Sequence, residues 1–259
     1  MKKNSQIEQP TANTQSVYNH SEETHSLLLS LIIPAYNEMD RLPSYLMSIK
    51  SYFLNKYSDN YEIIIVDDGS SDGLKEKVTE IQQSWPQIKY IRHSSNQGKG
   101  AAVRTGMKNA EGKYLLFTDA DGATDIEHEE QFRKSIDSGA DIVIGSRLLK
   151  SSVMTQKRTI IRKVIAKLFS TIVNLVTSLD LKDTQCGFKM FRRDVGQRLF
   201  DSSTNNGYLF DIEILLKAKS LGCNILVLPV NWSDIPGSKV RIIVDSAVML
   251  KDLFFINKS

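Results

Sequence analysis

The feature that most constrains the fold is a series of short, continuously apolar segments that alternate with helical patterns. The apolar segments occupy residues 27–35, 61–68, 88–93, 113–121, 140–147 and 223–230. Between them, apolar residues recur with helical spacing over 40–57, 74–85, 98–110 and 126–139. Apolar strands separated by helices are typical of a mostly parallel sheet that is covered on both faces. We therefore expect an α/β fold with a Rossmann-like sheet.

Polar clusters follow four of the predicted strands. In chain order they read "PAYNE", "DDGSSD", "DAD" and "GSR". In a parallel α/β sheet, ligands bind outside the carboxyl ends of the strands. The four clusters are therefore expected to converge on one crevice, which is a stronger indication of a site than any single cluster.

Composition and charge limit the class of protein. Hydrophobic residues make up 41% and charged residues 24%, and the net charge of +3 does not indicate general polyanion binding. Cys186 and Cys223 lack metal or redox spacing and are predicted to be apolar filler in a reducing compartment. Residues 1–26 are predicted to be a disordered polar leader, and residues 27–259 one domain with a C-terminal helical extension. We find no signal peptide and no apolar run of spanning length.

The strongest chemical signal is the pair Asp119 and Asp121 directly after the strand predicted at 113–121. Two close carboxylates repel each other, and a hard divalent cation removes that repulsion. Mg²⁺ or Mn²⁺ typically takes one or two protein carboxylates and its other ligands from substrate phosphates. We therefore predict a Mg²⁺ or Mn²⁺ site for a diphosphate ligand, although Asp and Gly are also common in simple turns.

The other strand ends suggest nucleotide contacts. Pro34 and Tyr36 can flank a flat base, and Glu38 can accept hydrogen bonds from a base or ribose. Asp67 or Asp68 can accept from a base N–H, while Ser70, Ser71 and Asp72 are equally suited to cap the next helix. The glycines of "NQGKG" permit close approach of phosphate to the backbone, with Lys99 as a point charge.

Taken in order, several motifs resemble family 2 glycosyltransferases of the GT-A fold. The motifs are "LSLIIPAYNE", "IIIVDDGSSD", "NQGKGAAVRTGM", "FTDADGAT" and "IVIGSR". The later "DTQCGFKMFRR", "FDIEILLKA" and "PVNWSDIPGSKV" are similar to the branch that loads a sugar onto a polyisoprenyl phosphate, with dolichyl-phosphate β-glucosyltransferases nearest. The resemblance spans about residues 27–255. It implies a metal-dependent hexosyltransferase.

The resemblance also implies roles for individual residues. The donor nucleotide sugar, with UDP-glucose favoured, would be held by Pro34, Tyr36, Glu38, Asp68, Lys99, Asp119, Ala120 and Asp121. Asp119 and Asp121 would also hold the metal. The acceptor phosphate would be met by Arg147, Ser238 and Lys239.

Three positions or segments depart from the pattern of the relatives. Mannosyl-transferring relatives carry a glutamine where this chain has Ala123, which favours the glucosyl branch. The dolichol enzymes often have an N-terminal membrane helix, where this chain has its polar leader. Tyr208 and Leu209 precede "FD" where that branch often has a tryptophan.

The chemistry expected from this resemblance is a single displacement. A lipid phosphate is already anionic and needs no strong base, so the barrier lies in the charge on the leaving diphosphate. Attack on an α-linked donor would invert it to a β-linked product. Asp211 and Glu213 lie where many relatives keep a base, and two interpretations remain open: substrate positioning, or helix capping and solvation.

Attachment to a membrane is predicted from the basic stretch 150–198, which holds eleven Lys and Arg against three Asp. The helix predicted at 156–179 has an apolar face and basic residues, as an interfacial helix does, but packing on the sheet would explain it equally well. A lipid acceptor favours a peripheral protein on the cytoplasmic face of a membrane. The final helix could pack beside it or mediate homo-oligomer formation.

Two other functions fit parts of the sequence. One is a family 2 transferase that acts on a soluble glycan or protein, with Asp211 as base. The other is a nucleotide-sugar-binding protein without turnover, which the combination of Asp119, Asp121, Arg147 and Lys239 disfavours. The sequence alone does not fix the sugar, the base or the length of the lipid.

Overall fold

The computed structural model describes residues 27–149, 152, 177, 179, 181, 183–233 and 235. The strands predicted from apolar runs are confirmed as β1 to β5 and β7. The elements are β1 (Leu27–Ala35), α1 (Leu42–Leu54), β2 (Tyr61–Asp67), α2 (Leu74–Gln83), β3 (Ile88–Arg92), α3 (Lys99–Lys108), β4 (Gly112–Thr118), the 3-10 helix η1 (Ile126–His128), α4 (Glu129–Asp137), β5 (Ile142–Ser146), β6 (Phe188–Arg192), α6 (Arg193–Asp201), α7 (Phe210–Ser220) and β7 (Ile225–Pro229).

The strands form one mixed sheet in the order β3-β2-β1-β4-β6-β5-β7. Parallel pairing joins β1 to β2 and β4, β2 to β3, and β5 to β7, whereas β6 runs antiparallel between β4 and β5. Sequence reasoning missed β6 and α6, because "FKMFR" places a lysine inside the strand. Lys189 is nevertheless only 1% exposed, since it is paired with Asp211 from α7.

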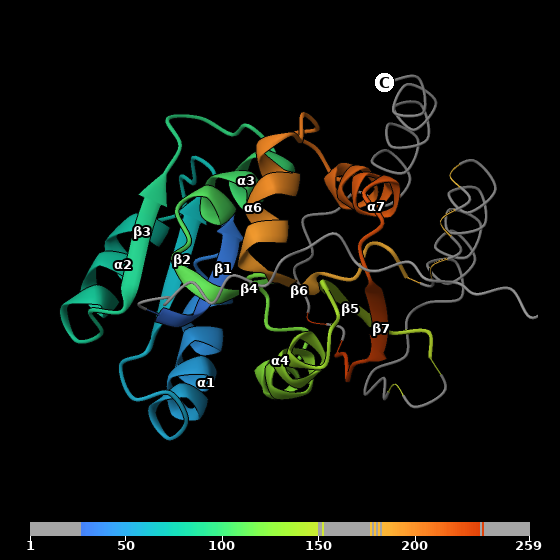
Figure 1. Ribbon diagram of the computed structural model, residues 1–259. Helices are drawn as coiled ribbons and strands as arrows, with labels where there is room; N and C mark the ends of the chain where they lie inside the picture. Colours follow the sequence, from blue (N-terminus) through green and yellow to red (C-terminus); the bar gives the residue numbers. More distant parts are fainter. Residues whose placement is uncertain are drawn as a thin grey trace, which may run out of the picture.

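Two hydrophobic layers cover the sheet, as the continuous apolar runs require (Figure 1). One layer packs α1, α2 and α4 against one face, with Leu46, Val78 and Phe132 in its core. The other packs α3, α6 and α7 against the opposite face, with Val103 and Leu199 in its core. Successive strand residues alternate between the layers, so that β1 sends Leu31 to the first and Ile32 to the second.

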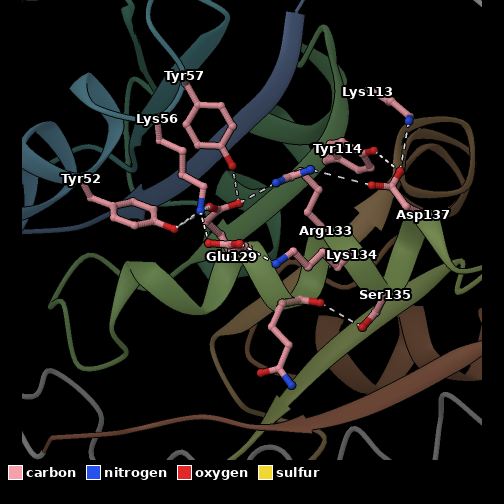
Figure 2. Close-up of polar contacts among 12 residues, drawn as sticks. Tyr52, Lys56, Tyr57, Lys113, Tyr114, Glu129, Arg133, Lys134, Ser135 and Asp137 are labelled. Carbon is pink, nitrogen blue, oxygen red and sulfur yellow. Dashed lines mark hydrogen bonds and ion pairs between the residues drawn. The ribbon is translucent and has the colours of Figure 1, made fainter.

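A buried glutamate joins α1 to α4 beneath the sheet (Figure 2). The carboxylate of Glu129 is fully buried and accepts hydrogen bonds from the hydroxyls of Tyr52 and Tyr57. Lys56 Nζ lies 2.9 Å from Glu129 Oε1 and supplies the opposite charge. The cluster therefore ties the last turn of α1, and the residues just after it, to the first residue of α4.

Some predictions fall on residues outside the described part of the chain. They are the disordered leader 1–26, most of the basic helix at 156–179, the final helix, Ser238 and Lys239. Within the described residues, no helix combines the length and apolar character needed to cross a membrane.

The Glu129 cluster gives a stability prediction. Glu129→Gln removes the charge that faces Lys56 and leaves buried donors poorly satisfied, so it should lower the free energy of unfolding by about 1–3 kcal/mol. Glu130→Gln is the matched control, because Glu130 also pairs with Lys56 but its side chain is 43% exposed. It should leave the urea midpoint nearly unchanged. Equal midpoints for the two variants would contradict a stabilising role of the buried carboxylate.

Candidate active site

Three of the four polar clusters meet at one pocket on the carboxyl edge of the sheet, as predicted, whereas the "GSR" cluster at the end of β5 does not line it. The ends of β1, β2 and β4 and the start of α3 surround a pocket of about 240 Å³. The pocket is lined by Pro34, Ala35, Tyr36, Glu38, Arg41, Asp68, Asn96, Gly98, Lys99, Ala102, Asp119, Ala120, Asp121, Gly207 and Tyr208. This set contains every residue predicted to hold a nucleotide sugar.

Cations from two other elements face the carboxylates of Asp119 and Asp121. Lys99 Nζ, at the start of α3, lies 2.6 Å from Asp119 Oδ1. Arg41 Nη1, just before α1, lies 3.7 Å from Asp121 Oδ2. Arg41 is itself held by Glu38, whose Oε2 accepts a 2.7 Å hydrogen bond from Arg41 Nε. Acidic and basic side chains therefore alternate around the pocket: Lys99 faces Asp119, and Arg41 lies between Asp121 and Glu38.

The surroundings disturb the ionisation of this cluster. Burial raises the pKa of Asp121, and the neighbouring charge of Asp119 raises it further. Burial would lower the pKa of Lys99, but the charges of Asp119 and Asp211 outweigh it and raise that pKa. Lys99 therefore remains a cation, while Asp121 gains from any additional positive charge placed beside it.

Arg41 was missed by sequence reasoning. Its Nη1 atom is buried and has no hydrogen-bond partner within the described part of the chain. A buried guanidinium nitrogen without a partner is costly unless a ligand satisfies it. The residue is adjacent to the "YNE" motif, but no sequence pattern indicated that its side chain turns into the crevice.

The loop that carries the two aspartates is supported by Tyr45 from α1. The Tyr45 hydroxyl lies 3.1 Å from Thr118 Oγ1. Gly122 has a φ of +68°, and a Cβ there would lie 2.9 Å from the Tyr45 ring. The backbone N–H of Ala123 donates to Asp121 Oδ1 at 3.0 Å, so the loop itself orients this carboxylate.

The turn 183–187 packs directly on Asp119. The N–H of Asp119 donates to the carbonyl of Gly187 at 3.1 Å. A Cβ on Gly187 would fall 1.9 Å from Asp119 Oδ2, so only glycine admits the carboxylate here. Sequence reasoning gave Gly187 no role, because the contact joins segments far apart in the chain.

The two aspartates at the end of β2 hold loops together. Asp68 accepts hydrogen bonds from the N–H groups of Gln97 at 2.9 Å and Gly98 at 2.8 Å, and from His93 Nδ1 at 2.7 Å. Asp67 is fully buried and accepts from Arg92 Nη1 at 2.8 Å. Asp68 still lines the pocket, but both of its oxygens already orient the segment before α3.

Asp72 contributes to the predicted cap of α2, because its Oδ1 accepts from the N–H of Leu74 at 3.2 Å. The N-cap residue itself is Gly73, which has no side-chain cap. Ser70 Oγ instead accepts from the N–H of Asn37 at 2.9 Å, and Asp72 Oδ2 accepts from the N–H of Met39 at 2.9 Å. These bonds tie the β2 end to the β1 end and stiffen that side of the pocket.

The glycines before and within α3 approach protein backbone. A Cβ on Gly98 or Gly100 would lie 2.3 Å from the carbonyl oxygen of Asn206 or 2.4 Å from that of Asn205, respectively. The N–H of Gly100 donates to the Asn206 carbonyl at 2.8 Å. These glycines therefore make room for residues 205 and 206, while Gly98 and Lys99 line the pocket; the approach of a phosphate here stays a prediction.

Arg147 lies at the end of β5, where it was predicted, and pairs with Asp183. Its Nε and Nη2 atoms lie 2.8 Å from Oδ2 and 2.5 Å from Oδ1 of that carboxylate. The Trp232 ring centre lies 5.8 Å from the guanidinium carbon. Burial opposes the charge of Arg147, but Asp183 outweighs it and raises the pKa.

Asp211 and Glu213 have different surroundings. Asp211 is 4% exposed and lies 2.5 Å from Lys189 Nζ, and burial raises its pKa although Lys189 and Lys99 oppose this. Glu213 accepts from the N–H groups of Thr204 and Asn205, each at 2.9 Å. Glu213 therefore holds the loop that packs on α3, whereas Asp211 faces the site cluster.

Comparisons with known proteins agree with this geometry. Residues 30–200 match the family described as "Glycosyl transferase family 2". Dolichyl-phosphate beta-glucosyltransferase of Saccharomyces cerevisiae is 36% identical over 92% of this chain and 76% of the relative. The enzymes of the same name from Dictyostelium discoideum and Homo sapiens are 38% and 32% identical, over 92% and 88% of this chain and 76% and 74% of the relatives.

Solved structures share the fold at low sequence identity. Glucosyl-3-phosphoglycerate synthase from Mycobacterium tuberculosis, in complex with UDP, superposes with a TM-score of 0.64 at 17% identity, over 89% of this chain and 80% of that one. S. aureus TarS 1-349 with UDP-GlcNAc gives 0.59 at 18% identity, over 89% and 66%.

Glu213 gives a pH-dependent stability prediction. Burial would raise the pKa of Glu213, but Lys217 and the N–H groups of Asn205 and Thr204 outweigh it and lower the pKa. Its contribution is therefore present above the unfolded pKa of about 4.3 and is lost as pH falls through the lower folded value. Glu213→Gln should cost about 1–3 kcal/mol of unfolding free energy at neutral pH.

Urea denaturation at several pH values checks the direction of this pH dependence. The difference between the wild-type protein and Glu213→Gln should shrink as pH falls below about 4. Glu80→Gln serves as control, because the Glu80 side chain is 67% exposed, and should change the midpoint little at any pH. A difference for Glu213→Gln that is independent of pH would contradict the assigned role.

Proposed function

The chain belongs to glycosyl transferase family 2, and we propose that it moves glucose from UDP-glucose onto a polyisoprenyl phosphate with inversion at the sugar carbon. The proposal rests on relatives named dolichyl-phosphate beta-glucosyltransferase, of which the chain covers about three quarters. The observation that carries it is the pair Asp119 and Asp121 in a pocket where Lys99 and Arg41 balance their charge. We further propose that residues 27–259 form one catalytic unit.

The pocket residues fit a divalent metal. Asp121 has a raised pKa beside Asp119, so an added cation relieves real repulsion. The described residues contain no cluster of three or more His, Cys, Asp or Glu that could hold an ion, so a metal here would need ligands from a diphosphate. That division of ligands suits Mg²⁺ or Mn²⁺. One structural neighbour is described in complex with Mn²⁺ and UDP-glucose. When bound, the ion would supply positive charge to the leaving diphosphate.

The chain's own residues then have distinct tasks toward the donor. Pro34 and Tyr36 flank the base, and the Tyr36 side chain is suitably accessible at 41%. Glu38 and Asp68 orient the nucleotide from the pocket wall. Lys99 and Nη1 of Arg41, which is paired with Asp121 but makes no hydrogen bond to the described residues, also reach the diphosphate oxygens. They lower the cost of negative charge on the leaving group.

Attack by a lipid phosphate requires no strong base, and Asp211, which lies where many relatives keep one, is already paired. Asp211 is committed to Lys189 at 2.5 Å within the buried core of the site. A phosphate monoester is already charged at neutral pH and attacks directly. Asp211 therefore positions Lys189 and the neighbouring turn, and a single displacement gives a β-linked product.

The acceptor side is assigned to Arg147 together with Ser238 and Lys239. Arg147 stands at the β5 end on the same edge of the sheet as the donor pocket. An arginine fork suits a phosphate group better than a lysine does. The basic stretch that follows Arg147 would meet anionic headgroups, so we propose a peripheral protein on the cytoplasmic face of a membrane.

Direct transfer tests the function. Purified protein with UDP-[¹⁴C]glucose, Mg²⁺ or Mn²⁺ and a short polyprenyl phosphate should move label into an organic extract, and EDTA should stop it. GDP-mannose should be a poor donor. Asp121→Asn should lower the rate about 100-fold or more while the protein stays folded. Label entering soluble glycan or protein but not the lipid would favour the other transferase class, and donor binding without turnover would favour a binding protein.

Gly187→Ala tests the geometry of the metal-binding carboxylate. A methyl group 1.9 Å from Asp119 Oδ2 must displace that side chain. We expect weaker Mn²⁺-dependent UDP binding by calorimetry, by about tenfold or more. The melting temperature controls for a general loss of fold. Normal affinity in a folded Gly187→Ala protein would contradict the requirement for this carboxylate position.

A further inference from the structure

The carboxylate of Asp183 orients the guanidinium of Arg147. Neither the sequence motifs nor the names of the relatives give Asp183 a role. Asp183 accepts three hydrogen bonds from Arg147. They come from the backbone N–H at 2.7 Å, from Nε at 2.8 Å and from Nη2 at 2.5 Å. Side-chain and main-chain donors of the same residue thus meet one acceptor group. Paired bonds of this kind fix the plane of a guanidinium as well as its position.

The backbone of Asp183 is unusual. Its φ is +63°, one of only a few positive values at non-glycine residues among the described positions. Left-handed backbone is costly for residues with a Cβ, and such strain concentrates at functional sites. Asparagine or glycine would adopt this conformation as well as aspartate does. The conformation therefore does not require the charge, whereas the contact with Arg147 does.

The turn that begins at Asp183 also reaches the donor side. The N–H of Cys186 donates to the Asp183 carbonyl at 3.0 Å, which closes the turn, and Gly187 then packs on Asp119. One short segment thus contacts both the carboxylate assigned to the metal and the arginine assigned to the acceptor. The turn therefore sets the distance between Asp119 and Arg147.

Trp232 supports the other side of Arg147. Its ring centre lies 5.8 Å from the guanidinium carbon, and residue 232 forms an isolated β-bridge with Thr124. Ser233 donates its N–H to the carbonyl of Ala123 at 2.8 Å. With Nε and Nη2 committed to Asp183, Nη1 is the guanidinium nitrogen that remains, among the contacts of the described residues, to face a ligand.

We propose that Asp183 is a positioning residue that holds the guanidinium of Arg147 in the orientation that receives the acceptor phosphate. This rests on the proposed function, because it assumes that the ligand of Arg147 is a phosphate monoester. Asp183 acts through Arg147 and does not touch the reacting atoms. Without it the guanidinium keeps its charge but loses its fixed direction, and misplacement of about 1 Å can cost about 100-fold in rate.

Asp183→Asn is the informative variant, since it keeps the size and the left-handed backbone and removes the charge. Asp141→Asn is the matched control: Asp141 is also 8% exposed and also faces an arginine, Arg192, at 2.7 Å. It lies before β5, whereas Arg147 follows that strand. Asp183→Asn should raise the KM for a short polyprenyl phosphate and lower kcat about 10–100-fold, with the KM for UDP-glucose changed less than about twofold. Asp141→Asn should change neither KM.

A double-variant comparison separates positioning from a direct role. If Asp183 acts through Arg147, adding Asp183→Asn to Arg147→Ala should cost little beyond Arg147→Ala alone. The proposal would be overturned if the rate losses of Asp183→Asn and Arg147→Ala multiply in the double variant. It would also be overturned if Asp183→Asn has wild-type kinetics, or changes the KM values for UDP-glucose and polyprenyl phosphate equally.

A binding measurement keeps this inference separate from the proposed function. Calorimetry with farnesyl phosphate should show about tenfold weaker affinity for Asp183→Asn than for wild type, whether or not glucose is transferred. Absence of transfer by the wild-type protein would refute the proposed function. Affinity for farnesyl phosphate that does not depend on Asp183, or is absent in the wild type, would refute the positioning role.

Discussion

The structure depends on one electrostatic constraint: two carboxylates at the mouth of β4 need positive charge beside them. Burial and the charge of Asp119 raise the pKa of Asp121, and Arg41 and Lys99 oppose that rise from two directions. Both cations come from elements that begin at this edge of the sheet. The parallel strand arrangement is therefore what brings the charges together, and the same cations are in place to meet the diphosphate of a donor.

A second constraint links the donor side to the acceptor side. The turn 183–187 leads into β6, the antiparallel strand between β4 and β5. Its Gly187 packs on Asp119 after β4, and its Asp183 holds Arg147 after β5. Inserting one antiparallel strand between two parallel ones thus places a turn at the carboxyl edge. That turn sets the distance between the donor side and the acceptor side of the site.

The sequence predicted the sheet and the donor pocket because both follow from local patterns. Apolar runs located β1 to β5 and β7, and strand-end clusters located Asp119, Asp121 and Lys99. What it missed depends on contacts between distant segments. β6 contains Lys189, which is buried beside Asp211, and the glycines around Lys99 make room for residues 205 and 206. Arg41 and Asp183 were missed for the same reason, since their partners are set by the tertiary fold.

The most direct test of this account is a titration of Mn²⁺ into the purified protein, followed by electron paramagnetic resonance with and without UDP. Because the described residues contain no cluster of three or more His, Cys, Asp or Glu that could hold an ion, binding should be weak alone and become tight and stoichiometric with UDP. Asp121→Asn should abolish the tight binding, while Glu80→Gln should leave it unchanged. UDP affinity that is the same in EDTA and in Mn²⁺, and unaltered by Asp121→Asn, would contradict the account.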